Sequence, residues 1–101
     1  MHARLARYAI EPDRLDDAVE SFRQAGRELS ELDGFVGGHV LVDRDEGTLM
    51  TLTLWESRAA VDASDVRAAT LRQRALRAVD GDVQSVTCYE VPVELGRRVS
   101  G

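Results

Sequence analysis

The sequence predicts a single α+β domain with the order strand–helix–strand–strand–helix–strand. A chain of 101 residues has room for one domain only. One long segment repeats apolar residues at helical spacing, and shorter segments rich in Val, Thr and Leu lie between turns. Apolar residues make up 44% of the chain, which is enough for a globular domain to bury a core.

The first strand and the first helix are predicted from the N-terminal third of the chain. Residues 3–10 include aromatic and branched side chains such as Tyr8, which favour a strand. Pro12 ends this strand and suits the first turn of a helix, because no backbone N–H is needed there. Asp33-Gly34 supplies the stop signal of that helix. The helix carries one apolar stripe, formed by Leu15, Ala18, Val19, Phe22, Gly26, Leu29 and Leu32.

A hairpin is predicted next. Residues 35–42 and 48–55 form its two strands, and the polar segment 43–47 forms the turn. Apolar or neutral side chains occupy both alternating positions of these strands, so neither face of the sheet is expected to be charged, apart from Arg7 and Glu90. A second copy of the chain is the available cover for the second face. The sequence therefore predicts a twofold homodimer that packs sheet on sheet.

The second helix is predicted over residues 58–79, with Ser57 as its cap and Gly81 after its end. The last strand follows over residues 83–91. The helix is rich in alanine and carries few bulky apolar side chains. It either packs closely on the sheet or leaves an apolar void above it that suits a small molecule, and the sequence leaves both alternatives open.

This order of elements predicts the ferredoxin-like arrangement, in which a four-stranded antiparallel sheet carries both helices on one face. We assign residues 1–92 to this domain. Residues 93–101 are expected to form a flexible C-terminal tail, because Pro92 follows the last strand and no apolar pattern continues beyond it.

Charge and composition exclude several classes of function. The formal net charge of -5 argues against a nucleic-acid partner, since such binding depends on cations that meet phosphates. All 13 basic residues are arginine, so no lysine is present to form a Schiff base. No apolar run approaches the ~20 residues that span a bilayer, so no membrane partner is expected. The N-terminal residues show no secretion signal, and we expect a cytoplasmic protein.

No metal and no bound cofactor are expected. Cys88 is the only cysteine, so the chain forms no internal disulfide and no thiolate metal site by itself. The carboxylates Asp43, Asp45 and Glu46 lie in the predicted hairpin turn and lack the full calcium-loop pattern. No glycine-rich phosphate loop follows a strand at the required spacing.

Three short segments, in their order and spacing, resemble the antibiotic biosynthesis monooxygenase family. They are Leu32-Asp33-Gly34-Phe35-Val36-Gly37 after the first helix, Leu52-Thr53-Leu54-Trp55-Glu56-Ser57 at the join of the third strand and the second helix, and Cys88-Tyr89-Glu90-Val91 in the last strand. The resemblance covers residues 3–92. It implies a dimeric α/β barrel with a ligand cavity between the sheet and the helices of each subunit. It also implies cofactor-free oxidation of phenolic or quinol substrates by O₂, or haem degradation, or the fold alone.

Two branches of that family do not fit this sequence. The haem-degrading branch is similar in using an asparagine on the first strand and a histidine on the second helix. This chain contains no asparagine, and its histidines, His2 and His39, lie outside the second helix. The branch that handles autoinducer sugars is similar in having a histidine soon after the third strand, where this chain has Asp62-Ala63-Ser64.

Arg7, Tyr8 and His39 are the candidate catalytic residues. Arg7 offers a cation to an anionic substrate or a developing oxyanion, and its alternative role is an ion pair with Glu90. Tyr8 offers a hydrogen bond to a phenolate, or else packs with its hydroxyl exposed. His39 carries the imidazole group that most often serves in acid–base catalysis, and its alternative role is that of a core or interface histidine satisfied by a backbone group.

Trp55, Thr53 and Phe22 are the candidate substrate-binding residues. Trp55 offers a surface on which a flat aromatic substrate stacks. Its alternative role is that of a large core anchor at the corner between the third strand and the second helix. Cys88 is expected to be a small buried hydrophobe rather than a reactive thiol.

Together these observations predict a small-molecule-binding homodimer similar to cofactor-independent monooxygenases that oxidise phenolic or polycyclic aromatic substrates with O₂. The partner molecule is expected to be small and hydrophobic or aromatic. The alternative is a non-catalytic ligand-binding or structural dimer of the same fold, which the missing asparagine and helix histidine favour. A third hypothesis is a subunit that docks to a larger enzyme, and it predicts a large exposed apolar patch.

Overall fold

The computed structural model describes residues 1–96 and has the predicted α+β order. The chain folds into one sheet and two helices, and a short 3₁₀ turn, η1, leads into the first helix. The elements are β1 (His2–Ala9), η1 (Pro12–Arg14), α1 (Leu15–Leu29), β2 (Phe35–Asp43), β3 (Thr48–Trp55), α2 (Arg58–Arg77) and β4 (Asp82–Glu90). Within residues 1–96 no helix is long and apolar enough to cross a membrane.

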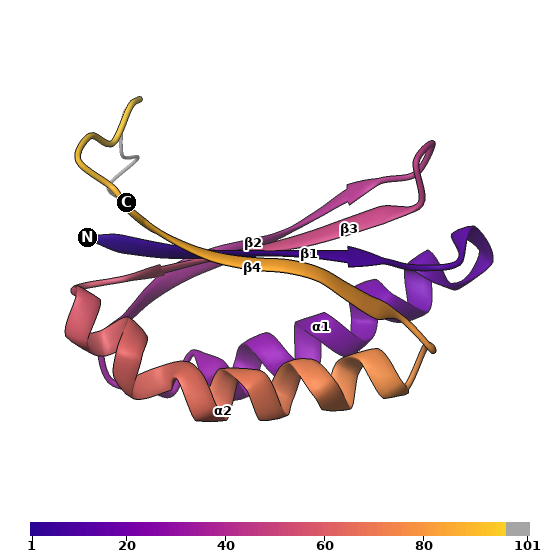
Figure 1. Ribbon diagram of the computed structural model, residues 1–101, viewed down its shortest axis with the longest axis horizontal. Helices are drawn as coiled ribbons and strands as arrows, with labels where there is room; N and C mark the ends of the chain where they lie inside the picture. The colour runs from indigo at the N-terminus through magenta and orange to yellow at the C-terminus, as the bar shows by residue number, and fades with distance from the viewer. Residues whose placement is uncertain (97–101) are drawn as a thin grey trace.

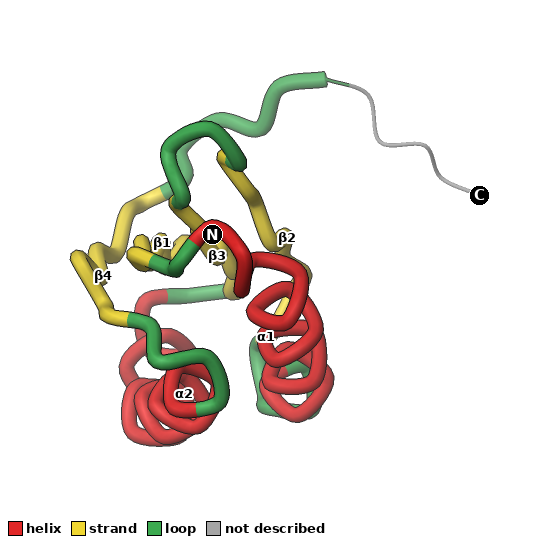
Figure 2. The backbone as a smooth tube through the Cα atoms, turned by 90° about the vertical axis from the view of Figure 1, so that its right-hand side faces the viewer, coloured by secondary structure: helices red, strands yellow, loops and turns green. Residues whose placement is uncertain are grey.

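The four strands form one antiparallel sheet in the order β2-β3-β1-β4. Both helices cover the same face of this sheet, as the ferredoxin-like prediction requires, and Figure 1 shows them side by side beneath the strands. In the end-on view of Figure 2 the two helices form one layer and the strands form the other. No helix of the described part of the chain covers the second face.

Cross-strand register decides which side chains face the helices. In an antiparallel sheet directly paired residues point to the same face, and neighbours along a strand alternate. Ala6 pairs with Thr51 and Tyr8 pairs with Leu49, and the buried members of these rows belong to the core beneath the sheet. We call this side the helix face. The rows between them, which include the Leu5–Leu52 pair, point to the other side, called the open face.

The core lies between the helix face and the two helices. The rings of Tyr8 and Phe22 pack with their centroids 4.6 Å apart, so α1 is anchored directly on β1. Phe22 belongs to the apolar stripe predicted from the sequence, and the stripe faces the sheet as expected. The core cluster comprises Ala6, Tyr8, Ile10, Leu15, Ala18, Phe22, Leu49, Ala75, Leu76 and Val79.

Two of the segments that resemble the family meet at one corner of the fold. Gly34 accepts a backbone hydrogen bond from Glu56 N–H at 2.8 Å. The rings of Phe35 and Trp55 pack edge to face, with centroids 5.3 Å apart. Gly34 has φ +84°, and a Cβ there would lie 2.4 Å from the Cβ of Ala60. Only glycine fits this position, which locks the start of β2 against the start of α2.

Most element boundaries differ from the predicted ones by one or two residues, but α1 ends at Leu29, before Leu32 of the predicted stripe and before the predicted stop at Asp33-Gly34. Ser57 caps α2 as predicted, since its side chain accepts the Ala60 N–H at 3.1 Å. The helix ends at Arg77 rather than at residue 79, because the chain turns through Asp80, which has φ 52°. That left-handed residue comes one position before Gly81, which the sequence suggested as the stop.

Residues 91–96 run away from the sheet after β4, as the yellow end of the ribbon shows in Figure 1. Val91 N–H donates to the carbonyl of Met1 at 2.9 Å, which extends the pairing of β4 with β1 by one step. Val93 and Leu95 are exposed. Residues 97–101 of the predicted tail lie outside the described residues.

Candidate functional site

A cavity of about 370 Å³ lies between the helix face of the sheet and the two helices. Strands β1, β2 and β3 form its roof in the orientation of Figure 1, and α1 and α2 form its floor. Its volume is within the range of small-molecule sites. The sequence left open whether the alanine-rich α2 packs closely on the sheet or leaves an apolar void, and the structure has the void. Apolar and aromatic side chains dominate its lining, among them Tyr8, Phe22, Leu29, Phe35, Val40 and Leu71.

Hydroxyl groups are the polar feature of the sheet side of this cavity. Tyr8 is 1% exposed, and its hydroxyl lies 3.2 Å from Thr51 Oγ1, so that either group donates. Thr53 follows on the same strand and the same face. The cavity thus brings together three of the predicted site residues, Tyr8, Thr53 and Phe22. A bound molecule that carries an oxygen atom would meet a hydrogen-bonding pair inside an otherwise apolar space.

Trp55 does not line the cavity but lies behind its wall. Its side chain is fully buried, and its Nε1–H donates to Thr53 Oγ1 at 3.0 Å. Its ring also packs edge to face against Phe35. Trp55 thus holds Thr53 and Phe35 in place, and both of these residues line the cavity. Trp55 therefore orients the wall, in keeping with its alternative role as a core anchor, and direct stacking on a substrate stays a prediction.

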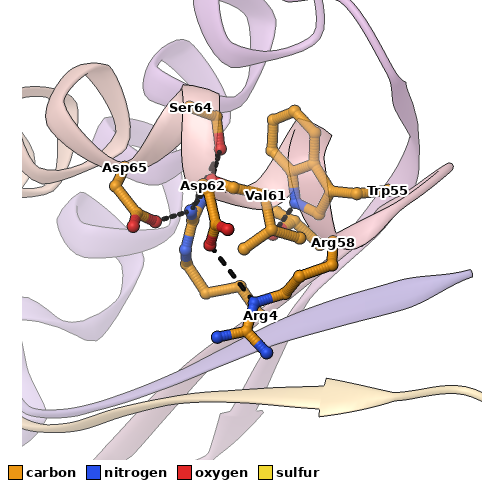
Figure 3. A network of polar contacts seen from close by, with 8 residues as sticks. Arg4, Trp55, Arg58, Val61, Asp62, Ser64 and Asp65 are labelled. Carbon is orange, nitrogen blue, oxygen red and sulfur yellow. Dashed lines mark hydrogen bonds and ion pairs between the residues drawn. The ribbon is translucent and has the colours of Figure 1, made fainter.

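Arg4 is a site residue that the sequence reasoning missed. It is 5% exposed, lines the cavity, and reaches from β1 to α2, as Figure 3 shows. Its Nη2 donates to the Val61 carbonyl at 3.0 Å, to Ser64 Oγ at 3.0 Å and to Asp65 Oδ1 at 2.5 Å. Its guanidinium carbon lies 5.6 Å from the ring centroid of Trp55. The guanidinium is therefore held in one position by α2 and by an aromatic ring.

One nitrogen of this guanidinium has no partner. Arg4 Nη1 is buried and has no hydrogen-bond acceptor among the described residues. The signal that could have found Arg4 is its place two residues before Ala6 and four before Tyr8, in the same alternation phase. The sequence alone did not show which phase faces the helices, so the arginine could not be assigned to the buried side.

Arg7 and His39 lie on the open face. Arg7 pairs with Met50, and His39 pairs with Leu52, so their side chains point away from the helices. His39 borders the cavity as part of β2, but its register places its side chain on the other side of the sheet. These two candidates therefore share the open face, on strands separated by β3, and neither lies with Tyr8. Their catalytic role stays a prediction.

The alternative role of Arg7 as a partner of Glu90 is not realised. Arg7 Nε donates to Gln84 Oε1 at 3.2 Å, whereas Glu90 pairs with His2 at the opposite end of β1. The expectation that Cys88 is buried is also wrong, since this cysteine is exposed. The reason is that β4 is an edge strand, and all of its residues remain exposed.

Metal ligands are not grouped in the described part of the chain. Within residues 1–96, no cluster of three or more His, Cys, Asp or Glu side chains is placed to hold an ion. The cavity offers hydroxyl and guanidinium groups instead. These groups bind and polarise the oxygen atoms of an organic molecule.

Comparison with known proteins gives a family and a fold. The profile of the family described as antibiotic biosynthesis monooxygenase matches residues 1–81. No curated protein matches the chain. Solved structures match over nearly the whole chain, with sequence identities that support the fold alone.

Three of these structures are the following. A candidate antibiotic biosynthesis monooxygenase from Deinococcus radiodurans has a TM-score of 0.75 and 14% identity, over 97% of this chain and 99% of that one. SnoaB from Streptomyces nogalater, a cofactor-independent oxygenase, has a TM-score of 0.71 and 17% identity, over 95% and 97%. A candidate family member from Nitrosomonas europaea has a TM-score of 0.71 and 10% identity, over 92% and 100%. The family profile covers most of the sequence, and this chain belongs to the antibiotic biosynthesis monooxygenase family.

Proposed function

We propose that this protein binds a small hydrophobic or aromatic molecule in the cavity beneath the sheet and oxidises it with O₂, without a bound cofactor. The observation that carries the proposal is the Tyr8–Thr51 hydroxyl pair, which lies buried in a cavity of about 370 Å³ with mostly apolar walls. Family membership supports the reaction class, and the similar protein SnoaB is described as a cofactor-independent oxygenase.

In the proposed reaction the substrate supplies the electrons. An anthrone or a hydroquinone loses a proton to solvent and becomes an electron-rich anion that reacts with O₂. For an anthrone, the ring CH₂ becomes C=O, one oxygen atom enters the product, and the other leaves as water. The Tyr8 hydroxyl donates a hydrogen bond to the oxygen on which the negative charge of the substrate gathers, which lowers the barrier to ionisation. The apolar walls hold the rings and exclude bulk water.

Oxygen uptake with a panel of anthrones and hydroquinones tests this proposal. The chain has two tyrosines, and they make a matched pair, because Tyr8 is buried in the cavity wall and Tyr89 is half exposed on β4. We expect Tyr8→Phe to lower kcat/KM about tenfold, the lower end of what one hydrogen bond to a developing anion contributes. Tyr89→Phe should leave it unchanged. Equal rates for both variants would remove the Tyr8 hydroxyl from the mechanism.

Arg7 and His39, the other two predicted catalytic residues, reach a substrate only from the open face. The double variant Arg7→Ala/His39→Ala tests that alternative location. A large loss of oxygen uptake in this variant, with Tyr8→Phe unaffected, would move the chemistry out of the cavity and onto the sheet surface.

A non-catalytic ligand binder is the second candidate function, and one observation favours it. No carboxylate lines the cavity, and the side chain of His39 points away from it, so within the described residues no carboxylate or imidazole is placed there to remove a proton. A binder predicts that aromatic ligands raise the melting temperature of the protein without oxygen uptake. Uptake that depends on Tyr8 would exclude this candidate.

We also propose that two copies of the chain pack through their open faces in the cytoplasm. The open face carries Leu41, which is 41% exposed, and Tyr89, which is 50% exposed, together with the apolar row Leu5–Leu52. Apolar side chains on an uncovered sheet face favour association with a second sheet. The expected assembly is a homodimer, and its mass in solution is the test.

A further inference from the structure

The cavity has a one-sided charge. Four arginines contribute to its lining, and no aspartate or glutamate does. They are Arg4, Arg23, Arg27 and Arg72. The whole chain has a formal net charge of -5, so this excess of positive charge is local and opposes the general balance of the molecule. Arg4 is buried and Arg72 half-buried, whereas Arg23 and Arg27 are exposed, so part of this charge is solvated. Cationic walls of this kind attract an anion.

Two of these arginines lack an acidic partner. Arg4 pairs with Asp65, and Arg23 pairs with Glu20 at 3.0 Å. Arg27 and Arg72 form no ion pair with any residue of the described range 1–96. Elsewhere between the helices the pattern is different, because Arg67 and Arg74 both bind the carboxylate of Glu28. The arginines Arg27 and Arg72 at the cavity therefore keep an uncompensated positive charge, whereas Glu28 neutralises part of the charge of Arg67 and Arg74.

Gly26 marks open space next to Arg27. This glycine lies within α1 and lines the cavity, and a Cβ added to it would meet no atom within 4 Å. Glycine is a poor helix former, and no positive φ explains its presence here. The missing side chain leaves room for a bound molecule that lies along α1. A molecule lying over Gly26 reaches the guanidinium of the next residue.

We propose that the ligand of the cavity is an aromatic molecule bound as an anion. Its rings lie against Phe22, Leu71 and the open space over Gly26. Its negatively charged group meets Arg27, while Arg72 adds positive charge to the same walls. The inference rests on the proposed function, because it assumes that the cavity is a ligand site. It adds the charge of the ligand, which nothing in the family assignment specifies.

The positive charge of the lining also explains how the substrate could ionise without a side chain in the cavity that removes its proton. Positive groups near a phenol or an enol favour its ionised form, whereas a carboxylate in the same place would oppose ionisation. A cavity that ionises its ligand with arginines needs no side chain to remove the proton, because solvent accepts it. The described lining is consistent with this arrangement, since it contains guanidinium groups and no carboxylate.

Two fluorescent probes with one ring system test the proposal. 8-Anilinonaphthalene-1-sulfonate is an aromatic anion, and N-phenyl-1-naphthylamine is the same skeleton without the sulfonate. Wild-type protein should bind the anionic probe more tightly than the neutral one. Arg27→Gln should weaken binding of the anionic probe roughly three- to fivefold, the effect of one partly solvated charge, and the double variant Arg27→Gln/Arg72→Gln roughly tenfold. Binding of the neutral probe should change less than about twofold.

Arg77→Gln is the matched control. Arg27 and Arg77 both lie in the last turn of a helix and lack an ion-pair partner in the described residues, but Arg77 does not line the cavity. The control variant should bind both probes as wild type does. Equal affinity of wild type for the two probes, or an equal loss in the Arg27→Gln and Arg77→Gln variants, would overturn the proposal.

Gly26→Leu separates this proposal from the proposed function. Leucine favours the helix and fills the open space, so the variant should fold and lose affinity for both probes about tenfold or more. If Gly26→Leu weakens both probes and Arg27→Gln weakens neither, the cavity is a ligand site and the inferred charge is wrong. If Gly26→Leu weakens the binding of neither probe, the probes bind elsewhere, and the proposal that the cavity is a ligand site is wrong as well.

Discussion

The two faces of the sheet are built from the same four strands and differ in what covers them. The helix face carries the buried Tyr8, Leu49 and Trp55, and both helices close over it. The open face carries Leu5, Leu52 and Leu41, and no described element lies over it. The covered side nevertheless holds polar groups, namely a hydroxyl pair and an arginine whose second terminal nitrogen has no hydrogen-bond partner among the described residues.

This difference suggests two uses for one sheet. Polar groups buried beside a void cost stability unless a ligand or water satisfies them, so they indicate a binding function on the helix face. Apolar groups left exposed lose contact energy unless another surface covers them, so they indicate association on the open face. The predictions below test each side with a matched change on another surface.

The largest effect is expected from Trp55→Ala on the helix face. The side chain is fully buried and holds Thr53 and Phe35, so its removal leaves a large hole at the corner of the fold. We expect a loss of about 3–5 kcal/mol in the free energy of unfolding, measured by urea titration at fixed protein concentration. Val66→Ala, at a side chain that is 81% exposed on α2, should cost much less. Similar losses would mean that Trp55 is not a buried anchor of the fold in solution.

The second effect is the loss of the proposed dimer in Leu52→Asp. A carboxylate placed in the apolar centre of the open face loses its hydration on association, and His39, which pairs with position 52, offsets that cost only in part. The dissociation constant should rise at least ~100-fold, which corresponds to about 2.7 kcal/mol, in sedimentation velocity. Val66→Asp is the control, because Val66 is 81% exposed on α2, away from the open face. A wild-type monomer, or an undisturbed Leu52→Asp dimer, would contradict the packing of sheet on sheet.

A smaller effect, of opposite sign, is expected from Gly26→Ala. Alanine favours the helix and its Cβ meets open space, so the free energy of unfolding should rise by about 0.5–1 kcal/mol. Gly37→Ala is the counterpart on β2, where an added Cβ also meets no atom within 4 Å. Only the Gly26 variant should alter ligand affinity, as read from probe titrations. An altered affinity in the Gly37 variant would place a ligand on the open face.

The smallest effect is expected from Arg7→Ala/His39→Ala on oxygen uptake. Both side chains share the open face, and the sheet separates them from the cavity. The rate should stay within about twofold of wild type, less than the loss expected for removal of one hydrogen bond to the reacting anion. A drop of tenfold or more would place the catalytic groups on the open face and make the homodimer part of the active site.

Local pattern was enough for much of the fold. The apolar stripe that contains Phe22 and the cap at Ser57 each act within a few residues of sequence, whereas α1 ends at Leu29, before the stop expected at Asp33-Gly34. β3 has the bounds predicted for it, and the other strands differ by a residue or so. The exposure of Cys88 could not be predicted from local pattern, because the position of β4 at the edge is a property of the assembled sheet.

The candidate site was predictable in part. Tyr8 was predicted as a catalytic residue and Thr53 and Phe22 as substrate-binding residues, and all three line the cavity. Arg4 was passed over, and Arg7 was preferred to it, although the two arginines sit on the same strand three positions apart. An odd separation puts them on opposite faces, and only the face that carries the helices makes an arginine a cavity residue.

By itself the sequence determined the order of the elements and their approximate bounds, because periodicity and caps depend on residues close together in the chain. Its short motifs also carried the resemblance to the family. The tertiary structure alone decided which alternation phase of each strand faces the helices, and therefore that Arg4 lies inside while Arg7 and His39 lie outside. It also decided that α2 stands off the sheet far enough to leave a cavity. Both outcomes depend on the side of the sheet on which the two helices pack, and that is set by contacts between residues distant in the sequence.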